Sequence, residues 1–105
     1  MYKKIWMKGG YLKSVRVHSE IKHRRYKWFV HNKVNCLGID VPGQFELTLE
    51  RNGCCICPEA FDSVEEAEIC GTMYFDLAIY SRGWKDVKSV IDYWTDNFKK
   101  HNSNP

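Results

Sequence analysis

The fold is decided by residues 61–98, which read FDSVEEAEICGTMYFDLAIYSRGWKDVKSVIDYWTDNF and predict a pair of helices. Ser63 is followed three residues later by Glu66, a capping box that satisfies two backbone donors at a helix start. A helix is therefore expected to begin near Val64. Arg82-Gly83 is expected to end it, because glycine enters the left-handed conformation without a steric cost. A second helix then follows.

Both helices carry a periodic apolar pattern. In the first, small and apolar side chains recur at three- and four-residue steps: Val64, Ala67, Cys70, Gly71, Tyr74, Leu77, Ala78 and Ser81, widened by Ile69, Met73 and Tyr80. Gly71 costs about 1 kcal/mol relative to alanine inside a helix, so we expect a close neighbour there, most simply a sheet. The second helix is expected to bury one face, made of Val87, Val90, Ile91, Trp94 and Phe98.

The first half of the chain has the composition of β-strands, with aromatic and β-branched residues interleaved with Lys and Arg. Five strands are predicted: Lys3–Lys8, Tyr11–Ser19, His23–His31, Phe45–Glu50 and Cys54–Cys57. Gly9-Gly10 reads as a two-residue hairpin loop, and Asn52-Gly53 is a strong hairpin signal. Residues 32–44 are the longest irregular stretch and the best candidate for a mobile loop.

A two-residue loop at Gly9-Gly10 would divide the first hairpin into two chemically different faces. One face would carry Tyr2, Lys4, Trp6, Lys8, Tyr11 and Lys13, and the other Ile5, Met7 and Leu12. We expect the aliphatic face to meet the helices. The aromatic, basic face is expected to meet solvent or a ligand.

Together these patterns predict an α+β fold, a meander-like antiparallel sheet of about five strands with two C-terminal helices packed on one face. A chain of 105 residues is large enough for one core, so residues 1–100 are expected to form a single domain and 101–105 a frayed tail. No apolar run approaches the roughly 20 residues of a membrane helix. The N-terminus is too interrupted by charge for a signal peptide. We expect a cytoplasmic protein without a membrane partner, in the cytoplasm of a host cell if a phage encodes it.

The five cysteines are expected to be reduced and mostly buried thiols, since the count is odd and no export signal precedes them. Cys54-x-x-Cys57 is a weak zinc candidate, with Cys36 and Cys70 as further ligands. A second CxxC pair is missing, and a regular strand would direct Cys54 and Cys57 to opposite faces. No metal or other cofactor is therefore expected.

The sequence contains no motif that assembles a catalytic site. A nucleophile elbow, a phosphate loop, an HExxH helix and a dinucleotide-binding glycine motif are all missing. A cysteine nucleophile would need a histidine beside it, and no spacing in the chain enforces that proximity. We therefore expect a protein that is not an enzyme.

Charge is distributed unevenly along the chain. Residues 1–33 carry ten Lys and Arg against one acid, and residues 34–105 carry six against twelve, so the net charge of +3 combines +9 with −6. The first candidate partner-binding or nucleic-acid-binding surface is basic and aromatic: Lys4, Trp6, Lys8, Tyr11, Lys13, Arg24, Arg25, Lys27 and Trp28. The second is acidic: Glu59, Asp62, Glu65, Glu66 and Glu68. Carboxylates also suit the start of a helix, and the basic residues also suit a solvated rim around core aromatics.

The leading functional interpretation is a small non-enzymatic binding protein that occludes a macromolecular partner. Its most concrete form is an inhibitor of the phage or mobile-element type, anti-CRISPR or antirestriction-like, whose partner is a host protein or ribonucleoprotein complex. The alternative is a nucleic-acid-binding module that uses the basic, aromatic N-terminal strands. A third interpretation is a zinc-stabilised structural module.

Overall fold

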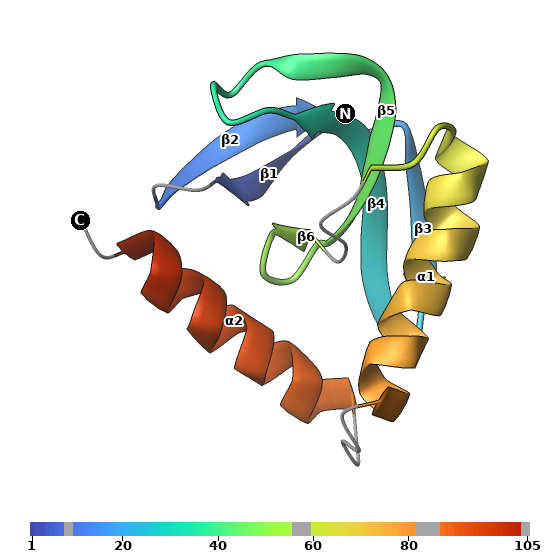
Figure 1. The fold of residues 1–105 in the computed structure, drawn as a ribbon, viewed down its shortest axis with the longest axis vertical. Helices are drawn as coiled ribbons and strands as arrows, with labels where there is room; N and C mark the ends of the chain where they lie inside the picture. Colours follow the sequence, from blue (N-terminus) through green and yellow to red (C-terminus); the bar gives the residue numbers. More distant parts are fainter. Residues whose placement is uncertain (8–9, 56–59, 82–86, 104–105) are drawn as a thin grey trace.

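The computed structural model describes residues 1–7, 10–55, 60–81 and 87–103, with residues 97–103 described by their backbone alone (Figure 1). In chain order, its elements are β1 (Tyr2–Met7), β2 (Tyr11–Arg16), β3 (Ser19–His23), β4 (Tyr26–Val34), β5 (Asp40–Leu49), β6 (Cys54–Cys55), α1 (Val64–Ser81) and α2 (Val87–Ser103). The predicted α+β class is confirmed. No helix among the described residues is long and apolar enough to cross a membrane.

The molecule has three layers, with an antiparallel sheet of order β3-β4-β5-β6 in the middle. The helices cover one face of this sheet, and the separate β1–β2 hairpin covers the other (Figure 1). Strand side chains alternate, so Trp28 and Val30 of β4 enter the helix-side core while Phe29 enters the hairpin-side core. A backbone hydrogen bond from Trp6 N–H to the Gly53 carbonyl, 3.0 Å long, joins the hairpin to the sheet.

α1 begins where the capping signal predicts. The Glu66 N–H donates to the Ser63 hydroxyl oxygen over 3.0 Å, and Phe61 exchanges two 2.8 Å backbone hydrogen bonds with Phe45 of β5. These contacts satisfy the first turn and fix where the helix leaves the sheet. α2 buries Val90 and Ile91 as predicted and runs to Ser103, three residues into the predicted tail.

The buried face of α1 is narrower than the predicted stripe. Ala67, Gly71 and Phe75 are its buried residues, whereas seven stripe members are exposed: Ile69, Cys70, Met73, Tyr74, Leu77, Tyr80 and Ser81. Apolar residues surround most of this helix, so periodicity alone does not choose the face. The contact at Gly71 chooses it. A Cβ there would stand 2.7 Å from Leu47 Cδ2 and 3.0 Å from Leu47 Cβ.

The first hairpin differs from prediction because its loop has three residues. Met7 pairs with Tyr11, and Gly10 takes a φ of +83° while its N–H donates to the Met7 carbonyl. The extra residue reverses the faces of β2 relative to β1. Lys13 therefore shares the face of Ile5, and Leu12 is exposed. The aliphatic face meets Phe29, on the side of the sheet opposite the helices.

Most of the predicted loop over residues 32–44 belongs to strands. β4 continues to Val34 and β5 begins at Asp40, with an irregularity between Asn32 and Lys33 where the register shifts. The short connection is closed by Asn35, whose Oδ1 accepts hydrogen bonds from the Leu37 and Ile39 N–H groups. An asparagine side chain that mimics a backbone turn in this way makes a long irregular loop unnecessary.

Substituting Gly71 tests the contact between α1 and β5. Gly71→Ala is expected to lower the free energy of unfolding by about 1–2 kcal/mol, because overpacking against Leu47 outweighs the gain in helix propensity. In a Leu47→Ala background the same substitution is expected to be neutral or stabilising, because the obstructing side chain is gone. Urea unfolding of the four proteins measures this coupling. Equal effects of Gly71→Ala in both backgrounds would contradict the close approach.

His31 is a fully buried polar group in the hairpin-side half of the sheet. Its Nδ1 donates to the Asn32 carbonyl over 2.7 Å, and its Nε2 accepts from the Thr48 hydroxyl over 2.8 Å. Both contacts suit a neutral ring, and burial lowers the pKa of His31 below its usual 6.5. As the pH falls, His31 is therefore protonated at a higher pH in the unfolded chain than in the folded protein.

Stability is expected to fall as pH drops below about 6.5, because protonation at His31 favours the unfolded chain. His31→Gln keeps a donor and an acceptor but does not titrate, so its free energy of unfolding should depend less on pH. Urea unfolding of both proteins between roughly pH 8 and pH 5 measures the difference. Parallel pH profiles would show that His31 does not carry this dependence.

Candidate functional site

A turn of two arginines joins β3 to β4. His23 pairs with Tyr26, which leaves Arg24 and Arg25 between them with φ angles of +52° and +70°. A residue with a Cβ pays about 1–2 kcal/mol in this left-handed region, which is why such turns normally contain Asn-Gly or Gly. The continuous strand predicted over His23–His31 is therefore wrong, because no turn-forming residue marks the place where the chain reverses.

The turn is fixed to α1 by one carboxylate. Asp76 accepts hydrogen bonds from Arg24 Nε over 2.6 Å and from His23 Nε2 over 2.8 Å. Burial acts to raise the pKa of Asp76, but the hydrogen bonds from His23 and Arg24 outweigh it, so this pKa lies below its usual 3.8. The Trp28 indole N–H also donates to the His23 carbonyl over 3.1 Å. These contacts hold the turn in its strained conformation.

Further cations surround the turn. Lys22 of β3 lies directly opposite Lys27 of β4, and both are exposed. Like charges facing each other across a strand pair are destabilising. The Arg51 guanidinium lies 5.9 Å from the centroid of the Tyr26 ring, beside the same end of the sheet. We call this group the basic hairpin: Lys22, Arg24, Arg25, Lys27 and the neighbouring Arg51.

Arg25 is the exposed tip of the basic hairpin. Arg24 is paired with Asp76, whereas Arg25, Lys22 and Lys27 make no ion pair with any residue that the structure describes. Three cations therefore face solvent within one two-residue turn and its flanking positions. Such a surface attracts anions strongly.

A shallow pocket of about 230 Å³ lies beside the basic hairpin and is lined by Lys3, Glu20, Ile21, Lys22, Lys27, Trp28 and Glu50. Lys3 bonds Glu50 and lies 3.7 Å from Glu20, and these hydrogen bonds and charges raise the pKa of Lys3. The three lysines of the lining exceed its two carboxylates by one positive charge. Lys22 and Lys27 form the positive rim of the pocket.

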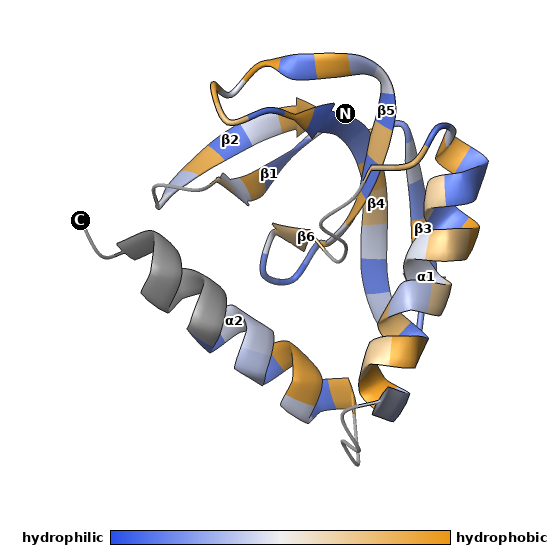
Figure 2. Cartoon of the chain, viewed as in Figure 1, coloured by the Kyte–Doolittle hydropathy of each residue, from blue (hydrophilic) through white to orange (hydrophobic). Residues whose placement is uncertain are grey.

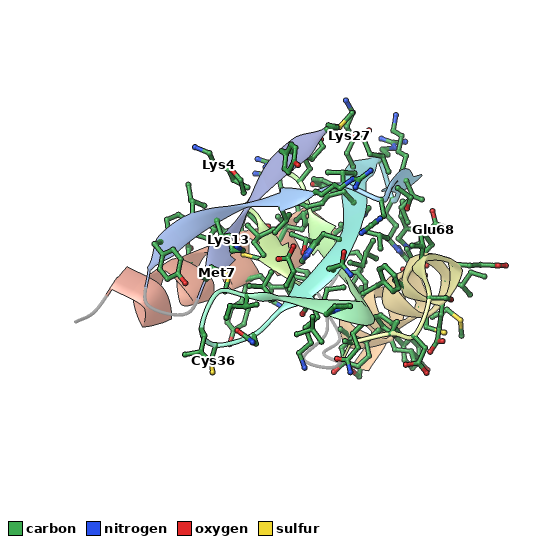
Figure 3. The ribbon with its side chains drawn as sticks, turned by 90° about the horizontal axis from the view of Figure 1, so that it is seen from above. Lys4, Met7, Lys13, Lys27, Cys36 and Glu68 are labelled. Carbon is green, nitrogen blue, oxygen red and sulfur yellow. The ribbon has the colours of Figure 1, made fainter. Side chains whose placement is uncertain are left out.

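Of the predicted basic, aromatic surface, only Arg24, Arg25 and Lys27 come together. Trp28 is 1% exposed and belongs to the core, which corrects its assignment as a binding residue. The reversed register separates the others: Lys4 and Trp6 lie on one face of the β1–β2 hairpin, and Tyr11 and Lys13 on the other. Lys4 and Lys27 both lie toward the same edge of the molecule in Figure 3. Lys8 is outside the described residues.

Two members of the basic hairpin, Lys22 and Arg51, were missed by the sequence analysis. The position of Lys22 could have been deduced from the hairpin, because a two-residue turn at Arg24-Arg25 places Lys22 opposite Lys27. Recognising that turn would have required a signal that arginines do not give. Arg51 is brought close through Glu50, whose N–H donates to the Lys27 carbonyl over 3.0 Å.

The predicted acidic surface does not form one row. Asp62, Glu65 and Glu66 are exposed around the first turn of α1, but Glu68 faces β3 and accepts a 2.9 Å hydrogen bond from the Ser19 hydroxyl. Successive helical residues are separated by about 100°, so Glu65 and Glu66 also diverge. Glu59 lies outside the described residues. The carboxylates thus suit a helix N-terminus better than a continuous acidic ridge.

The cysteines are dispersed over several elements. Cys36 in the β4–β5 connection and Cys70 on α1 are exposed free thiols, while Cys54 on β6 is buried. Cys55 is exposed as well, so the prediction that most cysteines are buried is wrong for those that the structure describes. Within the described ranges no group of His, Cys, Asp and Glu is arranged to hold a metal ion. Cys57 falls outside those ranges.

Comparison with family models, curated proteins and solved structures finds no match for this chain.

Substitutions of Arg25 test whether the turn is strained. Arg25→Gly is expected to exceed Arg25→Ala in free energy of unfolding by about 1 kcal/mol, because alanine keeps the steric cost of a left-handed φ and glycine does not. At an ordinary position the order is reversed, since glycine is the less stable residue. Thermal and urea unfolding of both variants show which of them has the higher free energy of unfolding. A more stable alanine variant would rule out the left-handed turn.

Proposed function

We propose that the protein is a non-enzymatic nucleic-acid-binding protein that contacts the phosphate backbone through the basic hairpin. The observation that carries this proposal is the Arg24-Arg25 turn, in which two arginines occupy positions that favour glycine. Lys22 and Lys27 add a second unfavourable feature by facing each other. A sequence that accepts both costs to keep four cations adjacent is best explained by an anionic ligand.

The residue types suit phosphate. A guanidinium presents a planar set of donors that matches two phosphate oxygens, and a lysine supplies a flexible point charge. Arg25 extends from a turn anchored through Asp76, so little of its backbone freedom has to be lost on binding. Contacts of this kind position a protein on nucleic acid without reading its sequence.

Base stacking is not part of the proposal. Trp28 is buried, and Tyr26 is partly buried with Arg51 beside its ring. A single-strand platform needs exposed aromatic faces on which successive bases stack. The basic hairpin offers charge without such faces. We therefore expect binding that varies little with base sequence and strongly with salt.

Salt titration of a labelled random-sequence duplex tests the proposal. Affinity should fall steeply with added salt, and Lys27→Gln should make the slope of log K against log salt shallower by about 0.9, the value of one lost phosphate contact. Lys33→Gln is the matched control. Lys33 lies six residues further along β4, roughly 20 Å away, and should leave the slope unchanged. Salt-independent binding, or equal effects of both substitutions, would contradict the proposal.

A second candidate function is occlusion of a macromolecular partner, a host protein or ribonucleoprotein complex, by an inhibitor of the phage-encoded, anti-CRISPR or antirestriction type acting in the host cytoplasm. It rests on the exposed carboxylates of Asp62, Glu65 and Glu66, which concentrate negative charge around the start of α1 although they do not form one row. Such a surface suits a partner with a basic nucleic-acid groove.

Charge reversal separates the two candidates. If an acidic surface occludes a partner, the double variant Glu65→Lys, Glu66→Lys should lose a partner captured from a lysate, while Arg25→Glu should keep it. The nucleic-acid proposal gives the opposite order for oligonucleotide binding. Affinity capture followed by elution at rising salt measures binding of the protein partner, and fluorescence anisotropy measures binding of the oligonucleotide. A partner retained equally by both variants would remove the occlusion candidate.

A further inference from the structure

α1 turns an apolar face away from the sheet between Ile69 and Tyr80. The large residues on this face are exposed by 52% at Ile69, 56% at Met73, 44% at Tyr74, 62% at Leu77 and 86% at Tyr80. At about 100° per residue, four of them lie in one arc on the side of the helix opposite the buried Ala67, Gly71 and Phe75: Ile69, Met73, Leu77 and Tyr80. Tyr74 lies outside this arc, beside Ala67 on the helix circumference. Apolar residues recur from the first to the last turn of α1 in Figure 2.

The fold of one chain does not account for this face. Large apolar side chains of a helix are normally buried, yet α1 lies at the edge of the molecule, with no described element on its outer side (Figure 1). The five side chains expose roughly 600 Å², about three quarters of the ~800 Å² that each partner buries in a standard interface. Contiguous apolar patches of this size mark interaction surfaces.

We infer that this outer face of α1 packs against α1 of a second copy of the chain, in an antiparallel two-fold arrangement. Between Ala67 and Ser81 the charged residues of α1 are Glu68 and Asp76, and neither falls in this arc. Glu68 accepts a hydrogen bond from Ser19 of β3, and Asp76 accepts one from Arg24 of the β3–β4 turn. A charged partner would find nothing on it to pair with, whereas an identical uncharged face is complementary in chemistry. A two-fold interface uses the same patch on both subunits.

The sequence of the outer face supports a register centred on Met73. In that register Ile69 lies opposite Leu77 of the partner subunit, and Glu66 lies opposite Tyr80 of the partner subunit. Glu66 is the one charged residue of α1 that falls in this arc, and the register places it against a hydroxyl that donates a hydrogen bond to a carboxylate. Met73 then lies opposite Met73 of the partner subunit.

The dimer stands independently of the nucleic-acid proposal, since it rests on α1 alone. It would nevertheless affect that function. Arg24 is bonded to Asp76 of α1, so pairing two α1 helices would hold two basic hairpins at a fixed separation. A bivalent protein of this kind binds a long polyanion more tightly than either site alone.

Sedimentation velocity from micromolar to near-millimolar protein tests the inference. The full chain should sediment as a dimer of the 12.4 kDa polypeptide, and Leu77→Glu should shift the equilibrium toward monomer by at least about tenfold in Kd. Leu37→Glu, at a residue 76% exposed in the β4–β5 connection, is the matched control and should remain dimeric. A monomeric wild-type protein at all concentrations, or loss of the dimer in Leu37→Glu alone, would overturn it.

A charge-pair rescue tests the register and guards against misfolding. Ile69→Lys and Leu77→Glu should each weaken the dimer, whereas the double variant should restore it, because each lysine would face a glutamate of the partner subunit. Far-UV circular dichroism should give the same melting transition for all three variants at concentrations where they are monomeric. A double variant more weakly associated than both single variants would overturn the antiparallel register.

Discussion

The close approach of α1 to β5 at Gly71 determines the relation between the helical layer and the rest of the molecule. Leu47 is fully buried, and only a residue without a side chain leaves room for it against the helix. This contact selects which of the apolar faces of α1 is buried. It also brings Asp76, one turn further along α1, to the β3–β4 turn, where it bonds His23 and Arg24. The packing of the core and the position of the basic hairpin thus share one steric cause.

β4 is the centre of this arrangement because both of its faces are covered. Trp28 and Val30 pack with Phe75, Val90 and other helix-side residues, and Phe29 packs beneath the β1–β2 hairpin. A strand buried on both sides allows no register slip, since a shift of one residue would exchange its two faces. Its first residues follow the Arg24-Arg25 turn directly. A rigid strand therefore supports a strained turn, which is the condition under which such strain persists.

Local signals in the sequence predicted the elements that have local causes. Ser63 and Glu66 located the start of α1, the period of α2 located Val90 and Ile91 in the core, and Gly71 indicated a close neighbour. The predictions of the β3–β4 turn and of the first hairpin failed for other reasons. The turn depends on contacts distant in sequence, and the hairpin depends on whether its loop has an even or an odd number of residues. Two arginines do not resemble a turn, and it is the contacts of Asp76 and Trp28 and the pairing of β3 with β4 that stabilise them in that role. One extra residue between Met7 and Tyr11 exchanged the two faces of β2 relative to the prediction.

In the candidate site, too, some features could be predicted from the sequence and others depend on contacts distant in sequence. The charge asymmetry directed the prediction to cations in the first third of the chain, and Arg24, Arg25 and Lys27 lie together at the β3–β4 turn. Trp28 joined the core instead, because an aromatic residue next to lysines in the sequence can lie on the opposite face of a strand from them. Which cations converge, and with what geometry, follows from the hairpin register and from the packing of α1.

The most direct examination of this account is an NMR titration of the isotopically labelled protein with a random-sequence oligonucleotide at low salt. Binding through the basic hairpin predicts backbone amide shifts that centre on residues 22–27 and on Arg51, with α2 unaffected. Shifts confined to the first turn of α1, or to the outer face of the β1–β2 hairpin, would contradict the assignment of the basic hairpin as the functional surface.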